Sequence, residues 1–286
     1  MRFYVSSAFL AAGEIIEIAK AADELGYEGI AIPDHVVNLE TLSTPYPYTP
    51  DGERRWQPFT DWLDPWALVG ALSQVTRRLK FVTTVYIPAM RDPYSAAKAI
   101  GTAAVLSGGR VELGIGVGWC EEEFDLLGQS FAKRGRRTDE MLELMKELWK
   151  PGWTEFDGEF YQTPRLEMTP TPPPIPIYGG GLSDIALRRA ARNDGWIGDL
   201  ISLDQAITSV ARIRELRAEK GLGMADFPVI TPLNDAFLPE HYQRAEDAGI
   251  FAVLTMPWMF YCGPDGTLAQ KIDGMARFRS DLGLDG

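Results

Sequence analysis

The chain has 286 residues, of which 45% are hydrophobic and 24% charged, and its formal net charge is −12. This length suits one large α/β barrel or two smaller domains with a well-buried core. The excess of acidic residues argues against nucleic acid or an anionic membrane as the main partner, because both require a basic face. No apolar stretch reaches the roughly 18 residues of a membrane helix, and the N-terminal segment lacks the apolar core of a signal peptide. We therefore expect a cytoplasmic protein.

Cysteine and histidine are scarce in the sequence. The two cysteines, Cys120 and Cys262, are far apart, and the two histidines are His35 and His241. A disulfide framework needs more cysteines, and a zinc site needs more soft or imidazole ligands. The sequence therefore predicts neither a disulfide nor a metal site.

Short apolar runs alternate with amphipathic stretches of helical period, such as residues 13–25 and 204–220. The runs of strand length are residues 2–7, 27–33, 79–87, 111–117, 175–181, 194–201, 228–236 and 249–257. Eight strand–helix units predict a single (β/α)8 TIM barrel of the α/β class over residues 1–286. A doubly wound open sheet is the alternative, because periodicity alone does not show that a sheet closes.

Two connections are too long to be plain loops. One, at residues 36–63, follows the second strand, and the other, at residues 151–174, precedes the fifth. The first carries four aromatic residues that we expect to close over a substrate: Tyr46, Tyr48, Trp56 and Trp62. The alternative is that these rings only pack the loop onto its own barrel.

Active sites of such barrels lie at the carboxyl ends of the strands. The fourth strand ends in "GIGVGW", in which Gly116 and Gly118 precede Trp119. Glycine inside a strand weakens it, so something must need the room. One interpretation is that the two glycines clear space for a flat ring that Trp119 helps to wall, and the other is that they ease barrel packing. A dinucleotide fingerprint is a poor match, because the spacing is GxGxG and three carboxylates follow.

A phosphate cradle is predicted after the fifth strand, in "YGGGLSDIALRRAAR". Gly179, Gly180 and Gly181 precede Ser183, which is a good N-cap for the helix that follows. Exposed backbone amides next to a helix start can bind a phosphate. A single cradle favours a mononucleotide-like cofactor over a dinucleotide, and an ordinary glycine-rich turn is the alternative.

His35 follows the second strand, where a histidine can pass a proton to or from a substrate. The alternative is a histidine that only holds a loop. His241 belongs to a polar helical segment and is expected to be a surface residue. A hydrolytic barrel would need two converging carboxylates, and among the strand ends only Asp34 and Asp199 are candidates.

Four segments together resemble the luciferase-like monooxygenase superfamily, and more closely its coenzyme F420-dependent oxidoreductase branch. They are "AADELGYEGIAIPDHV" (21–36), "SGGRVELGIGVGWCEEEF" (107–124), "RGRRTDEMLELMKELW" (134–149) and the stretch 158–197 that contains "YGGGLSDIALRRAAR". The resemblance implies a (β/α)8 barrel, commonly a homodimer, with a flavin or deazaflavin at the carboxyl ends of the strands.

The resemblance also assigns roles to residues. A bulge with a non-prolyl cis peptide behind the cofactor ring matches Thr83, Thr84 and Val85. An acid–histidine pair matches Asp34, which would contact the deazaflavin, and His35, which would manage the proton.

The phosphate is implied to bind the amides of Gly180, Gly181 and Ser183, with Arg137 as an additional ligand. Val117 stands where flavin-using luciferases have a phosphate arginine, which favours F420 over FMN. The polyglutamate tail of F420 would prefer a basic rim, for which Arg54, Arg55 and Arg91 are candidates.

We therefore expect an oxidoreductase that transfers a hydride between coenzyme F420 and a small organic molecule. The nearest alternative is an FMN-dependent luciferase-like monooxygenase that uses reduced flavin and oxygen. An alternative of another class is a non-catalytic flavin-binding protein.

Overall fold

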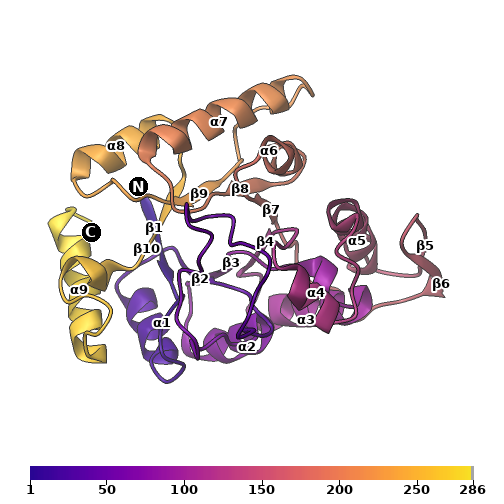
Figure 1. Ribbon diagram of the computed structural model, residues 1–286, viewed down its shortest axis with the longest axis horizontal. Coiled ribbons are helices and arrows are strands. Elements are labelled where there is room, and N and C mark those ends of the chain that lie inside the picture. Colours follow the sequence, from indigo (N-terminus) through magenta and orange to yellow (C-terminus); the bar gives the residue numbers. More distant parts are fainter. Residues whose placement is uncertain (285–286) are drawn as a thin grey trace.

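The computed structural model describes residues 1–284 and shows a closed barrel of parallel strands (Figure 1). Its strands, in the order in which neighbours pair, are β1 (Arg2–Ser6), β10 (Ala252–Thr255), β9 (Val229–Pro232), β8 (Gly195–Ile197), β7 (Ile177–Gly180), β4 (Val111–Ile115), β3 (Lys80–Thr83) and β2 (Gly29–Ile32). The predicted barrel is confirmed, and the open sheet is excluded because β1 pairs with both β10 and β2.

Helices surround the barrel and connect its strands (Figure 1). They are α1 (Ile15–Glu24), α2 (Pro65–Val75), α3 (Pro93–Leu106), α4 (Glu121–Leu126), α5 (Arg134–Leu148), α6 (Asp184–Ala190), α7 (Leu203–Ala218), α8 (Pro239–Asp247) and α9 (Leu268–Asp281), with short 3-10 segments η1 (Pro88–Met90) and η2 (Pro257–Phe260). Within the described residues, no helix is both long enough and apolar enough to cross a membrane.

Local sequence explains where several helices begin. The Asp64 side chain accepts hydrogen bonds from the amides of the first turn of α2, and Asp92 does the same for α3. In both helices a proline follows the capping aspartate, at a position where its missing N–H is not needed. Ser202 and Thr267 form capping boxes with the glutamines at the third helical position of α7 and α9.

The barrel interior is polar near the amino ends of the strands and apolar toward their carboxyl ends. Tyr4 and Tyr178 both donate hydrogen bonds to the buried Glu112 carboxylate, over 2.7 and 3.2 Å. Lys80, the first residue of β3, lies 3.4 Å from the same carboxylate. This cluster fills the amino-terminal end of the barrel, and active sites of such barrels lie at the opposite end, where the strands have their carboxyl ends.

The two long connections differ from each other. Residues 36–63 form turns and bends but no helix or strand, as expected for a lid. Residues 151–174 contain a two-stranded antiparallel hairpin, β5 (Thr154–Asp157) and β6 (Gln162–Leu166), which the sequence did not predict. The hairpin lies beside α5, away from the barrel (Figure 1).

The third strand is shorter than its apolar run. The strand was predicted at residues 79–87, but β3 ends at Thr83 and the Thr84–Val85 peptide bond is cis. The cis bond implied by the family resemblance is therefore present at the matching position. It turns the chain at the barrel mouth, and Tyr86 then bridges to Ile115 of β4.

Candidate active site

The carboxyl ends of the strands are partly open to solvent. The interiors of the strands are buried, whereas the residues at or just after their carboxyl ends are half-buried. These half-buried residues, one from each strand, are Ser6, Pro33, Thr84, Val117, Gly181, Asp199, Pro232 and Thr255. The mouth of the barrel is thus the place where a ligand can reach the strand ends.

Val85 stands between two glycines at this mouth. A Cβ atom on Gly116 would lie 2.6 Å from Val85 Cγ2, and one on Gly180 would lie 2.8 Å from Val85 Cγ1. Side chains at both positions are therefore excluded by Val85, which follows the cis bond. Because the two glycines have no side chains, the Val85 side chain can lie between the ends of β4 and β7, at the bottom of the barrel mouth.

The other glycines of this region also make room for protein atoms. A Cβ atom on Gly118 would lie 2.5 Å from the Phe124 ring, and one on Gly179 would lie 2.6 Å from Ala190 Cα. Gly118 and Gly181 also have positive φ angles of 79° and 108°, which other residues rarely adopt. Close packing thus explains the glycines without a ligand, as the second interpretation of "GIGVGW" supposed.

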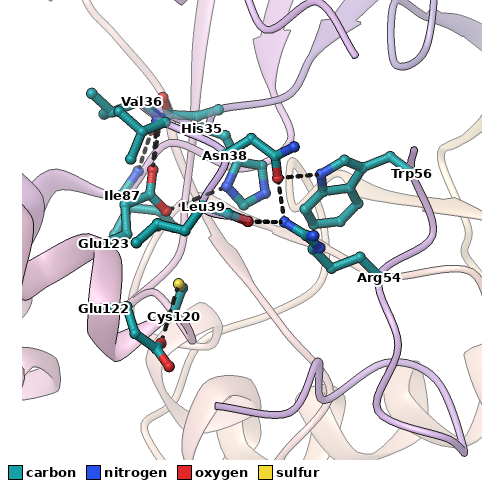
Figure 2. A network of polar contacts seen from close by, with 12 residues as sticks. His35, Val36, Asn38, Leu39, Arg54, Trp56, Ile87, Cys120, Glu122 and Glu123 are labelled. Carbon is teal, nitrogen blue, oxygen red and sulfur yellow. Dashed lines mark hydrogen bonds and ion pairs between the residues drawn. The ribbon is translucent and has the colours of Figure 1, made fainter. Parts of the chain in front are cut away.

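His35 lies beside Glu123 of α4 (Figure 2). Its Nδ1 atom is 3.3 Å from Glu123 Oε2, and the two side chains are 17% and 3% exposed. The other carboxylate oxygen of Glu123 accepts hydrogen bonds from the amides of Val36 and Val37, over 2.7 and 3.3 Å. One buried carboxylate therefore holds both the histidine ring and the backbone that follows it.

Electrostatics keep Glu123 ionised. Burial raises the pKa of Glu123, but hydrogen bonding and charge interaction with His35, together with the amides of Val36 and Val37, outweigh burial and lower it. Sequence reasoning missed this residue, because "CEEEF" was interpreted only as a helix start that repels a phosphate. Its position in the first turn after a strand end was the available signal, since that turn borders the mouth.

Aromatic rings cover His35. Trp56 and Trp62 lie 4.8 and 5.1 Å from the imidazole between ring centroids, and Trp119 lies 6.3 Å away. Tyr46 packs edge-on against Trp119 at 5.1 Å, and Tyr48 packs against Tyr46.

A cavity of about 10 Å³ remains between His35, Trp56, Trp119 and Glu123, which is about the space of one water molecule. The aromatic residues predicted to form a lid are brought together around the histidine.

Both carboxylate oxygens of Asp34 accept hydrogen bonds from protein groups. Its carboxylate receives two hydrogen bonds from Arg91, over 2.7 and 2.6 Å, and one from the Ile87 amide over 3.0 Å. Burial raises the pKa of Asp34, and the charge of Arg91 opposes that shift. The pair ties the end of β2 to the segment after the cis bond.

The arginines considered for a basic rim are paired inside the protein. Arg55 of the lid donates two hydrogen bonds to Asp199 after β8, over 2.8 and 3.1 Å. Arg54 donates to Asn38 and to the Leu39 carbonyl (Figure 2). With Arg91 bound to Asp34, the three guanidinium groups hold the lid and the strand ends rather than form a free basic surface.

The glycine-rich turn predicted to bind a phosphate follows β7. Gly181 donates its amide to the Ile197 carbonyl, and the Ser183 hydroxyl caps α6 by accepting from Ala186. Among residues 1–284, the amides of Leu182 and Ser183 have no acceptor. The glycine-rich turn therefore keeps two donors available.

Arg137 lies on α5, whose first turns pack beside α6 through the Arg189–Asp139 ion pair. The Arg137 guanidinium donates to the carbonyls of Ala89 and Ser130, over 3.0 and 2.6 Å. Its Nε atom is buried and has no partner in the part of the chain that the structure describes. Arg137 is therefore a buried residue that joins α5 to the segments at Ala89 and Ser130.

The chain is similar in sequence to two bacterial proteins. An uncharacterized protein of Mycobacterium tuberculosis is 39% identical over 290 residues, which cover 99% of both chains. F420-dependent glucose-6-phosphate dehydrogenase of Gordonia bronchialis is 32% identical over 191 residues, covering 64% of this chain and 52% of the dehydrogenase.

A solved structure of an F420-dependent secondary alcohol dehydrogenase, in complex with an F420–acetone adduct, superposes with a TM-score of 0.74. It covers 99% of both chains at 16% identity, so this likeness concerns the fold alone. The model of the luciferase-like monooxygenase family matches residues 4–248, which is most of the barrel. The resemblance found in the sequence is thereby confirmed, and the chain belongs to the luciferase-like monooxygenase family.

Proposed function

We propose that the protein is an oxidoreductase that transfers a hydride between coenzyme F420 and a small organic substrate. The observation that carries the proposal is a histidine at the barrel mouth, held by an ionised buried glutamate and covered by a closed aromatic lid. The relatedness to F420-dependent glucose-6-phosphate dehydrogenase supports the choice of cofactor.

The cofactor, when bound, accepts or supplies the hydride, and the protein supplies position and the proton. His35 takes the proton from a substrate hydroxyl when the carbon is oxidised, and returns it when the carbonyl is reduced. Val85, which lies between Gly116 and Gly180, would contact one face of the cofactor ring. Thr83 and Thr84 precede Val85 in the chain, and Gly118 and Trp119 would lie at the edge of the ring. Asp34 acts by fixing Arg91 and the Ile87 amide, because these partners occupy both of its oxygens.

The phosphate of the cofactor would bind the turn from Gly179 to Ser183. The free amides of Leu182 and Ser183 fit an anion, whereas the Gly181 amide is bonded to the Ile197 carbonyl. Arg137 is proposed as an additional phosphate ligand only through the family resemblance, because its guanidinium is buried and bonded to the carbonyls of Ala89 and Ser130. We also propose a homodimer, as the family resemblance implies, which light scattering of the purified protein would test.

The lid excludes water from the reacting atoms, since its closed form leaves space for about one water molecule beside His35. Tyr46, Tyr48, Trp56 and Trp62 would contact an apolar part of the substrate. Opening of the lid must precede substrate entry.

The test is a titration with F420 and with FMN, followed by the fluorescence of the mouth tryptophans. We expect tighter binding of F420, and turnover with F420 and simple alcohols or carbonyl compounds that H35A loses by about 10²-fold or more while its cofactor affinity stays the same. Tighter FMN binding with oxygen uptake would instead favour the monooxygenase that the family description names. Binding of either cofactor without turnover across a panel of substrates would favour a non-catalytic flavin-binding protein.

A further inference from the structure

The contact between Glu123 and His35 bears on the tautomer of the imidazole ring as well as on its position. A neutral imidazole carries one proton, on Nδ1 or on Nε2, and the partner of one nitrogen decides which tautomer forms. An ionised carboxylate only accepts hydrogen bonds, so a hydrogen bond to Glu123 requires the proton on Nδ1. Glu123 is 3% exposed and its pKa is lowered by these partners, despite burial that raises it.

We propose that Glu123 is a positioning residue that holds His35 in the Nδ1–H tautomer and leaves Nε2 bare as the proton acceptor at the barrel mouth. Figure 2 shows the second ring nitrogen of His35 on the side away from Glu123. With Nδ1 committed, only Nε2 can take a proton from a substrate hydroxyl. The tautomer itself is a property of the protein alone, whereas its use in catalysis rests on the proposed function.

The other histidine provides an internal reference. His241 on α8 accepts a hydrogen bond at Nδ1 from the Phe237 amide, over 3.1 Å. An amide always donates, so His241 must carry its proton on Nε2 when neutral. The chain has only two histidines, and the structure assigns them opposite tautomers.

The substitution Glu123→Gln separates positioning from anchoring. A glutamine keeps one carbonyl oxygen, which can still accept from the amides of Val36 and Val37. Its NH2 group can only donate, so it would favour the opposite tautomer of His35, with a bare Nδ1 and a proton on Nε2. Glu122→Gln is the matched control, because Glu122 binds Ser43 and Thr44 of the lid and does not contact His35.

The measurement is ¹⁵N NMR of protein labelled in its histidine rings, at alkaline pH and without cofactor. We expect the wild type to show one ring of each tautomer, with His35 assigned by the loss of its signals in H35N. E123Q should move His35 to Nε2–H, and E122Q should leave it at Nδ1–H. Exchange of the Val36 and Val37 amides, followed in the same samples, reports whether the anchor is kept.

A wild-type His35 that carries its proton on Nε2 would overturn the proposal, and this result needs no variant to fold. An unchanged tautomer in E123Q would overturn it as well. Turnover with F420 and an alcohol should fall by about 10²-fold in E123Q, with little change in the KM of the substrate. An inverted tautomer with full turnover would confirm the positioning but remove His35 from the proposed reaction, so the two failures are distinguishable.

Discussion

The ion pair between Arg55 and Asp199 joins the lid to the far side of the barrel. The lid leaves β2, and Asp199 follows β8; three strands separate β2 from β8 in either direction around the ring. The pair has two hydrogen bonds of 2.8 and 3.1 Å, and its side chains are 26% and 24% exposed. We expect it to stabilise the closed lid.

The size of this effect follows from the exposure of the pair. Exposed ion pairs contribute about 0.2–1 kcal/mol, whereas breaking a buried pair by removing one partner costs about 3–5 kcal/mol. A bidentate, partly exposed pair lies between these limits, at about 1–2 kcal/mol. This corresponds to an increase of about 5- to 30-fold in the population of the open lid when the pair is broken.

Limited proteolysis measures that population. Trypsin cleaves after Arg54 only when the lid opens, and under native conditions the rate follows the open fraction. D199N should therefore speed cleavage by about 5- to 30-fold. D184N is the matched control, since Asp184 also pairs with arginines but on exposed helices outside the lid. A double variant, R55Q with D199N, should be cleaved no faster than either single variant. Equal rates in wild type and D199N, or fully additive effects of R55Q and D199N, would refute the latch.

Three further predictions concern single residues. Gly180→Ala should lower the free energy of unfolding by about 1–3 kcal/mol in urea titrations. The reason is that the added Cβ atom would lie 2.8 Å from a valine methyl and 2.9 Å from a carbonyl oxygen. Gly70→Ala is the control and should not be destabilising, because a Cβ atom there meets nothing within 4 Å. Burial raises the pKa of Cys120 to about 11, so iodoacetamide at about pH 8 should label Cys262 first, as read by peptide mass spectrometry. Because the pKa of Glu123 is lower in the folded protein than in the unfolded chain, its ionised form stabilises the fold at pH values above the unfolded-state pKa. This stabilisation is lost as the pH falls through the folded-state pKa. The stability of E123Q, measured against pH, should therefore fall less in acid than that of the wild type.

The barrel was predictable because its strands are buried on both faces. Such strands are short apolar runs that end in glycine, proline or a polar residue, as in residues 111–117 and 228–236. The hairpin of β5 and β6 gave no such signal. Most of its residues are exposed, and Pro164 lies within β6, so its composition is that of a loop. Pairing between two exposed segments leaves little trace in hydrophobicity.

The residues of the site were predictable in kind but not in their partners. His35 and the lid aromatics could be placed from their positions after β2, and the structure brings them together. Glu123 is 88 positions from His35, and a contact across that distance depends on how α4 is set against β2. Gly116 and Gly118, just after β4, indicated a close approach, but only the packed structure shows that Val85 and Phe124 are the residues that approach them.

Two of the contacts that hold the lid differ in exposure, and we expect this difference to affect how the lid opens. On the α4 side, Glu123 is 3% exposed and binds His35 and two backbone amides. On the β8 side, Asp199 is 24% exposed and its one ionic partner among residues 1–284 is Arg55. The exposed pair costs less to break, because water can replace the lost partners. Opening should therefore begin at β8 and leave His35 attached to α4, so that a substrate entering from that side meets a ring whose orientation has not changed.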